Sequence, residues 1–213
     1  MYKTGKYQHF LILLSLVAAL YACEQKSASG NSGSVTITPA TAPQTEKSLP
    51  TGVDKSPMDM SYYPVDYPKL KMAKNAQEPL LARVIYSRPQ KSGRVIFGDV
   101  LKYGNVWRLG ANEATEIEFF KDVNIDNQKI DKGRYVLYCI PYEDKWTLVL
   151  NSDLFTWGLK IDSTKDLNKF TIPINKTKYP FEVFSMEFEK TGNGAQLVME
   201  WDSVQAKLPI NFK

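Results

Sequence analysis

The fold of this chain is decided by the stretch Tyr135-Val136-Leu137-Tyr138-Cys139-Ile140-Pro141-Tyr142-Glu143-Asp144-Lys145-Trp146-Thr147-Leu148-Val149-Leu150. Residues 135–140 are apolar on both faces, which is typical of a central strand that is covered on both sides. In the second half Trp146, Leu148 and Leu150 share one face of a strand, because side chains alternate along extended backbone. The acidic pair at 143–144 turns the chain between the two halves. The stretch therefore predicts a β-hairpin.

The same strand-and-turn pattern continues outward from residue 80. β-type runs are predicted at residues 81–86, 94–97, 114–120, 170–174, 184–188, 197–201 and 204–210. Turns are predicted at Asp126-Asn127, Lys132-Gly133 and Gly192-Asn193-Gly194. Nothing shows sustained helical periodicity beyond residue 22, and residues 153–158 look like a loop or a short helical turn. About nine or ten short strands predict an all-β single domain, an antiparallel, jelly-roll-like β-sandwich, with an open barrel as the alternative.

The N-terminus has the features of an export signal. Lys3 and Lys6 precede an apolar run over residues 10–20, far shorter than the ~20 residues that span a bilayer, so residues 1–22 are predicted to be a signal peptide. The run closes with Leu20-Tyr21-Ala22-Cys23, which resembles a bacterial lipobox. We expect Cys23 to become a lipidated N-terminus that anchors the protein to a membrane, on the periplasmic or surface face of the cell envelope. Ordinary secretion with cleavage near the same place is the alternative.

Two further segments precede the predicted domain at 80–213. Residues 23–61 are rich in Ser, Gly, Thr and Pro and predict a flexible tether, because they hold too few large apolar side chains to offset the entropy of ordering. Some forty such residues have an r.m.s. reach of roughly 35 Å. Residues 62–79 begin with a Tyr- and Pro-rich run and could lie against the domain as an extended strap, or bind a partner as a peptide.

Composition excludes several classes of function. Of the 27 Lys and Arg residues, Lys3 and Lys6 lie in the leader, so 25 basic residues remain against 23 acidic ones, too even a balance for a nucleic-acid-binding face. The only histidine is His9, also in the leader, which excludes a Ser-His-Asp triad and a His-ligated metal site. Cys139 lies in an apolar run and is expected to be buried and inert. We predict no metal and no cofactor, and no oligomeric state is indicated.

Polar chemistry is densest in the segment Trp107-Arg108-Leu109-Gly110-Ala111-Asn112-Glu113-Ala114-Thr115, which we call the polar motif. A loop at the end of a rigid sandwich commonly carries binding groups, and clustered guanidinium, amide and carboxylate groups suit a small anionic or carbohydrate ligand. The candidate ligand-binding residues are Arg88, Arg94, Arg108, Asn112 and Glu113. Trp157, in an irregular segment, is a better candidate for ligand stacking than Trp146, which has a strand-core pattern.

Two other functions remain open for the same residues. In the first, Arg108 and Glu113 form an internal ion pair, Asn112 caps the turn, and the domain is a structural or interaction module. In the second, Glu113 serves a hydrolase, which generally needs another carboxylate at roughly 5 to 10 Å, such as Asp99 or Glu116. No catalytic residue is assigned, and an enzyme is the less favoured class.

Several motifs occur in order along the chain: Tyr86-Ser87-Arg88-Pro89, Gly93-Arg94, Ile96-Phe97-Gly98, Tyr103-Gly104, Trp107-Arg108, the run from Gly110 to Thr115, Asp122-Val123, Gly133, Tyr135 and Ile140-Pro141. Together they resemble a family of secreted bacterial proteins known as domain of unknown function 2911. The resemblance covers about residues 80–210. The chain departs from it at Lys102, where the family pattern has proline, and at Leu109, where it has threonine. The resemblance implies export, and often lipidation, but it supplies no activity or catalytic residue.

Overall fold

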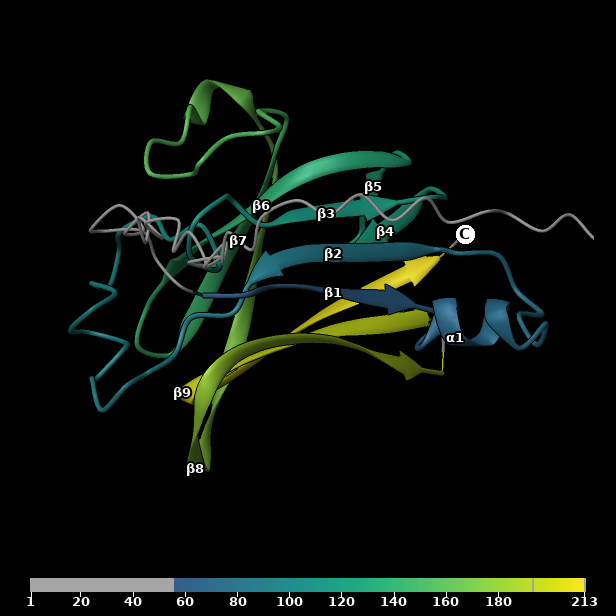
Figure 1. The fold of residues 1–213 in the computed structure, drawn as a ribbon. Helices are drawn as coiled ribbons and strands as arrows, with labels where there is room; N and C mark the ends of the chain where they lie inside the picture. Colours follow the sequence, from purple (N-terminus) through teal and green to yellow (C-terminus); the bar gives the residue numbers. More distant parts are fainter. Residues whose placement is uncertain (1–55, 193, 213) are drawn as a thin grey trace, which may run out of the picture. The chain divides into compact units, whose positions relative to one another are not determined.

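The computed structural model describes residues 56–192 and 194–212, whose strands form one antiparallel sheet (Figure 1). The sheet has nine strands in the order β1-β2-β3-β6-β7-β8-β9-β4-β5. The elements are β1 (Met58–Tyr63), α1 (Tyr67–Met72), β2 (Ala82–Ser87), β3 (Glu116–Phe119), β4 (Val123–Ile125), β5 (Gln128–Ile130), β6 (Gly133–Pro141), β7 (Lys145–Asn151), the 3-10 turn η1 (Ser163–Lys165), β8 (Asp166–Thr191) and β9 (Gly194–Phe212). The predicted all-β, antiparallel, single-domain fold is confirmed. The predicted signal peptide, Cys23 and most of the tether lie outside the described residues.

The predicted central hairpin is present as β6 and β7. Leu137 pairs with Leu150 and Cys139 with Leu148 across its inner face. All four of these side chains are completely buried. On the opposite face Tyr138 is also buried, so β6 is covered on both sides, as its apolar pattern indicates.

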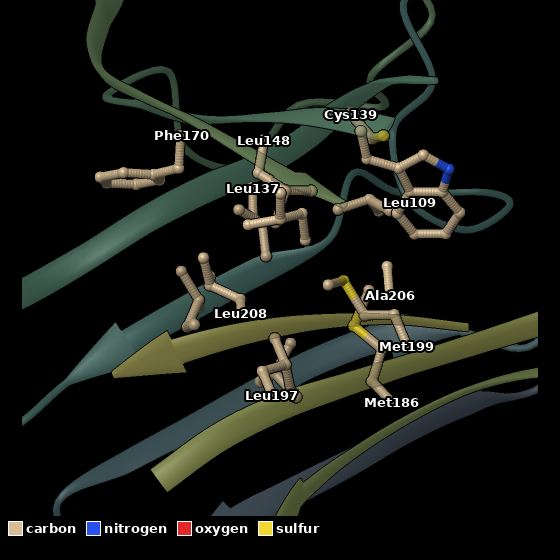
Figure 2. Packing of buried hydrophobic residues seen from close by; sticks show 14 of the residues in the cluster. Leu109, Leu137, Cys139, Leu148, Phe170, Met186, Leu197, Met199, Ala206 and Leu208 are labelled. Carbon is tan, nitrogen blue, oxygen red and sulfur yellow. The ribbon is translucent and has the colours of Figure 1, made fainter. Parts of the chain in front are cut away.

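The sheet bends along β8 so that its two halves face each other across one core. Residues 166–173 of β8 pair with β7, whereas residues 174–191 pair with β9. Figure 2 shows the two layers: Leu137, Leu148 and Phe170 on one side, and Leu197, Met199 and Leu208 on the other. Each such side chain contributes about 1.5–3 kcal/mol when fully buried, so this interior holds the sandwich together.

Two pairs of predicted strands are single long strands. The runs at 170–174 and 184–188 both belong to β8, which carries two register irregularities between residues 176 and 185. The runs at 197–201 and 204–210 both belong to β9, where Asp202 has a φ of 50°. Trp201 and Val204 are both buried, so the inward-facing positions change from odd to even at this residue. A left-handed residue within a strand changes the phase of alternation without ending the strand.

The short β4–β5 hairpin forms the last two strands in the sheet order, and its turn residues explain why it forms. Asp126 and Asn127, the predicted turn, both have positive φ and join β4 to β5. Two consecutive residues of positive φ are what a tight hairpin turn requires, and Asn and Asp tolerate that conformation. β4 then pairs with the end of β9, through Val123 with Phe212 and Asn124 with Asn211.

Three boundaries differ from the sequence interpretation. Residues 58–61, assigned to the tether, belong to β1, which pairs along its length with β2. The strap contains α1, where Pro68 lies in the first turn, a position that suits its fixed φ. The strand predicted at 94–97 is a loop, because Ser92, Gly93 and Gly98 have positive φ around it.

Within the described residues no helix has the length and apolar character needed to cross a bilayer.

Candidate functional site

The polar motif is a loop whose two ends are tied to β6. Trp107 exchanges two backbone hydrogen bonds with Cys139, at 2.7 and 2.8 Å, and the Thr115 carbonyl accepts from the Leu137 amide at 2.9 Å. The loop is closed at its base, where the Thr115 amide donates to the Arg108 carbonyl at 3.2 Å and the Thr115 hydroxyl donates to the Leu109 carbonyl at 2.5 Å. The two ends of the motif thus lie beside β6 and extend the row of hydrogen bonds that β3 makes with it.

The centre of the motif packs inward. Leu109 is completely buried although its φ is 54°, and the Trp107 indole N–H donates to the Gly110 carbonyl at 3.2 Å. A Cβ on Gly110 would lie 3.1 Å from the Ser87 carbonyl oxygen, so only glycine fits there without a shift. The Trp107 ring stacks on Trp201 from β9, with ring centroids 5.7 Å apart. These contacts fix the loop between the two layers.

Two of the five candidate residues, Arg94 and Arg108, line one hollow of about 300 Å³, which we call the arginine hollow. The described residues that line it are Pro89, Arg94, Val100, Leu101, Val106, Trp107, Arg108, Gly110, Ala111, Gly158, Leu159 and Trp201. None of these is acidic. The arginine hollow therefore combines two positive charges with an apolar wall that includes two tryptophans.

Local contacts position the two guanidinium groups. Arg94 donates through Nε to the Lys91 carbonyl at 2.9 Å and through Nη2 to the Gln90 carbonyl at 2.6 Å. Arg108 donates to the Trp157 carbonyl at 3.3 Å, and its guanidinium lies over the Trp157 ring, 6.0 Å from the centroid. Planar guanidinium groups held in this way suit carboxylate or phosphate oxygens.

Arg88 and Asn112 lie apart from the arginine hollow. Arg88 forms an ion pair with Asp59 of β1, with Nη1 and Oδ2 3.0 Å apart, and donates to the Phe184 carbonyl at 3.4 Å. Asn112 is buried, has a φ of 58°, and donates to the Ser56 carbonyl at 3.2 Å. Its Oδ1 is buried without a hydrogen-bond partner among the described residues. Both side chains thus tie the segment before and within β1 to the domain.

Glu113 is exposed and lines a second hollow, of about 330 Å³, with Met58, Phe155 and Glu116. Of the two carboxylates named for the hydrolase hypothesis, Asp99 and Glu116, Glu116 lines this hollow with Glu113. Its Oε1 accepts from the Phe155 amide at 3.1 Å and its Oε2 lies 3.5 Å from Arg134. Both Glu116 oxygens thus hold neighbouring groups in place.

Sequence reasoning missed the part of the arginine hollow that comes from distant segments. Trp201 lies on β9, and Gly158 and Leu159 lie in the loop between β7 and β8. Trp157, the candidate for ligand stacking on the irregular segment, is about half exposed, whereas Trp146 is completely buried, as its strand-core pattern indicates. The Phe-Thr-Trp-Gly-Leu run at 155–159, with large apolar residues where a loop is expected, was the available signal.

Burial keeps the Cys139 thiol and the Tyr86 hydroxyl protonated near neutral pH. Burial raises the pKa of the Cys139 thiol well above its usual value, so the thiolate is not formed near neutral pH. Burial likewise raises the pKa of Tyr86 to about 12, and its hydroxyl donates to the Met186 carbonyl at 3.3 Å. No cluster of three or more potential metal-binding His, Cys, Asp or Glu side chains occurs in the described ranges 56–192 and 194–212.

Comparison with known proteins identifies a family and no individual relative. The family described as "Protein of unknown function (DUF2911)" matches residues 68–210, from within α1 to near the end of β9. Neither a curated protein nor a solved structure matches the chain. Because the family match covers more than half of the 213 residues, the chain belongs to the DUF2911 family.

Proposed function

We propose that this protein is a lipid-anchored cell-envelope protein whose β-sandwich binds a small anionic ligand, including acidic sugars, in the arginine hollow. One observation carries the proposal: Arg94 and Arg108, from separate segments, line the same hollow with Trp107 and Trp201. Guanidinium groups recognise carboxylate or phosphate oxygens, and indole rings pack against the apolar faces of sugars or rings.

The proposed anchor is Cys23 of the lipobox, which would hold the domain at a membrane through the segment from 23 to 57. Its support is the sequence pattern, with a positive start, a short apolar run and a Cys at the expected place. Mass spectrometry of the N-terminal peptide tests it directly. A peptide that begins at Cys23 with added acyl mass is the expected result, and an unmodified or differently cleaved N-terminus contradicts it.

Tryptophan fluorescence can measure binding, because Trp107 and Trp201 line the arginine hollow. We expect glucuronate and inorganic phosphate to change the emission, and neutral glucose to bind more weakly than glucuronate. Arg94→Gln and Arg108→Gln should each weaken glucuronate binding by about ten-fold to a hundred-fold, since a charged hydrogen bond is worth roughly 1.5–3 kcal/mol.

Arg88→Gln is the matched control, because the Arg88 guanidinium is paired with Asp59 and does not line the arginine hollow. It should leave glucuronate binding unchanged. Binding equal to that of the parent in both the Arg94 and the Arg108 variants would remove the site assignment, as would the absence of any emission change with glucuronate and phosphate.

A second candidate function is a structural or interaction module in which the polar motif holds the sandwich together. The burial of Leu109 and Thr115 and the hydrogen bonds at the base of the motif favour it. This function predicts that Arg108→Gln lowers the melting temperature by several degrees, through loss of the contacts with Trp157, without any ligand effect. An unchanged melting temperature with weakened glucuronate binding favours the first function.

A further inference from the structure

The loop between β7 and β8 exposes three large apolar side chains in close succession. Phe155 is 82%, Trp157 48% and Leu159 75% exposed, and we call residues 154–160 the apolar loop. Scattered single apolar residues are ordinary on a protein surface. Three at alternate positions in one loop form a patch of the kind that marks an interaction surface.

The apolar loop is held in this conformation by buried polar contacts. Asn151 is completely buried; its Nδ2 donates to the Asp162 carbonyl at 2.9 Å, and its Oδ1 accepts from the Asp153 amide at 2.8 Å. One side chain thus closes both ends of the loop. Phe155 has a φ of 61°, a conformation rarely adopted by bulky residues, and its side chain still points to solvent. Backbone outliers of this kind concentrate at functional surfaces.

Positive charges accompany the apolar side chains. The guanidinium of Arg108 lies over the Trp157 ring and that of Arg134 over the Phe155 ring, at 6.0 and 5.9 Å from the centroids. Lys160, at the end of the loop, is exposed. Arg134 is also paired with Glu116 and Glu118, and Glu113 is an exposed acidic side chain in the hollow that Phe155 lines, so Arg108 and Lys160 are the cations that face a headgroup layer. Aromatic and aliphatic tips flanked by cationic groups match the interface of a bilayer, where apolar chains lie beneath anionic headgroups.

The chain enters the domain at the same end as the apolar loop. Asn112 of the polar motif donates to the Ser56 carbonyl, and the Ala114 amide of that motif donates to the Thr156 carbonyl at 3.0 Å. Met58, at the start of β1, lines the same hollow as Phe155. A segment arriving from Cys23 would therefore reach the domain beside this loop.

We propose that the apolar loop inserts into the interfacial region of a lipid bilayer, so that Phe155, Trp157 and Leu159 dock the domain on the membrane. The proposal rests on the proposed Cys23 anchor only for bringing the domain close to lipid. Insertion itself follows from the apolar tips and their cationic neighbours, and it would hold the domain at the membrane surface in one orientation.

Quenching by brominated lipid tests this on the full-length chain. The protein is incorporated into vesicles of phosphatidylcholine and phosphatidylglycerol, with and without bromine on the acyl chains. Trp107, Trp146 and Trp201 are buried, so the difference between the parent and a Trp157→Phe variant isolates the emission of Trp157. We expect brominated lipid to reduce this emission about two-fold or more, because an inserted indole lies at the acyl boundary.

Substitutions distinguish insertion of the apolar loop from nonspecific contact of the protein surface with lipid. The double variant Phe155→Ser with Leu159→Ser should abolish the quenching of Trp157. Tyr179→Ser is the matched control, since Tyr179 is 71% exposed on β8, away from the apolar loop in the sequence, and it should leave the quenching unchanged. Near-ultraviolet circular dichroism of each variant verifies that the fold is intact.

Three results overturn the proposal: equal Trp157 emission in brominated and plain vesicles, quenching that persists in the double variant, or a lipid-independent blue shift of Trp157 that grows with protein concentration. The last result would identify a second copy of the chain as the partner. Failure of the anchor is seen separately in the mass of the N-terminal peptide, and failure of ligand binding in the Arg94 and Arg108 variants.

Discussion

At the scale of single residues, Gly158 connects the apolar loop to the polar motif. Its φ is 76°, and a Cβ there would lie 2.9 Å from the Cβ atoms of both Ala114 and Arg108. Glycine alone combines this conformation with this approach. The wall of the arginine hollow thus depends on a residue that has no side chain.

We expect Gly158→Ala to lower the free energy of unfolding by about 1–3 kcal/mol, through overpacking added to backbone strain. Urea denaturation measures the change. Gly93→Ala is the control, because Gly93 has a similar φ of 73° with nothing within 4 Å of the position of a Cβ. If the two variants lose equal stability, the close approach at Gly158 contributes nothing.

The sequence identifies Arg94 and Arg108 as candidate binding residues, but it does not show that these two lie together and the other candidates do not. Arg94 and Arg108 were both named from the sequence, yet so were Arg88 and Glu113, which the fold places elsewhere. What separates them is local backbone: Arg94 follows the positive-φ residues Ser92 and Gly93 and lines the arginine hollow with Arg108. Single-residue chemistry indicates which side chains can bind, whereas loop conformation decides which of them meet.

At the scale of elements, the ionised side chain of Asp166 helps to hold the junction of β7 and β8. Burial acts to raise its pKa, but hydrogen bonds from Asn151, Tyr138 and Lys169 outweigh burial and lower it. The Tyr138 hydroxyl donates to Asp166 at 2.9 Å and the Asn151 amide at 2.9 Å. Asp166 thereby supports Asn151, which closes the apolar loop.

This arrangement predicts acid-sensitive stability. Because the pKa of Asp166 is lower in the folded state, its contribution is complete above the unfolded value of about 3.9 and is lost as pH falls through the folded value. Melting temperatures measured from pH 6 down to pH 2 should therefore fall less steeply for Asp166→Asn than for the parent. Asp99→Asn, at an exposed position, should retain the parent slope; identical slopes for all three proteins would contradict the role of Asp166.

Strand boundaries were predictable where alternation was unbroken and not where it changed phase. The β6–β7 hairpin and the Asp126-Asn127 turn follow directly from local pattern and turn chemistry. β9 reads as two strands because the inward positions change parity between Trp201 and Val204, and the left-handed Asp202 absorbs that change within one strand. α1 was missed because its six residues bury no side chain and so leave no apolar stripe.

At the scale of the whole molecule, one sheet supplies both faces of the sandwich, so access to the interior requires the layers to separate. Cys139 lies between those layers with its side chain completely buried. A thiol in this position reports on opening of the core.

We expect Cys139 to be unreactive toward a thiol reagent in the folded protein and fully reactive in urea. The measurement uses a Cys23→Ser background, since the chain has two cysteines. The labelling rate should increase in Gly158→Ala about ten-fold for each 1.4 kcal/mol of stability lost, if opening is global. Rapid labelling of the folded parent would show that the layers separate without unfolding.

The pairing of β4 with the end of β9 has a consequence for biosynthesis. Val123 and Asn124 emerge from the ribosome well before their partners Phe212 and Asn211, so a nascent chain carries the β4–β5 hairpin with one edge unpaired. Unpaired edges attract other strands, so a chain in this state is prone to intermolecular strand pairing until β9 is complete. Closure of the sheet is therefore a late step, because it waits for the last residues of β9.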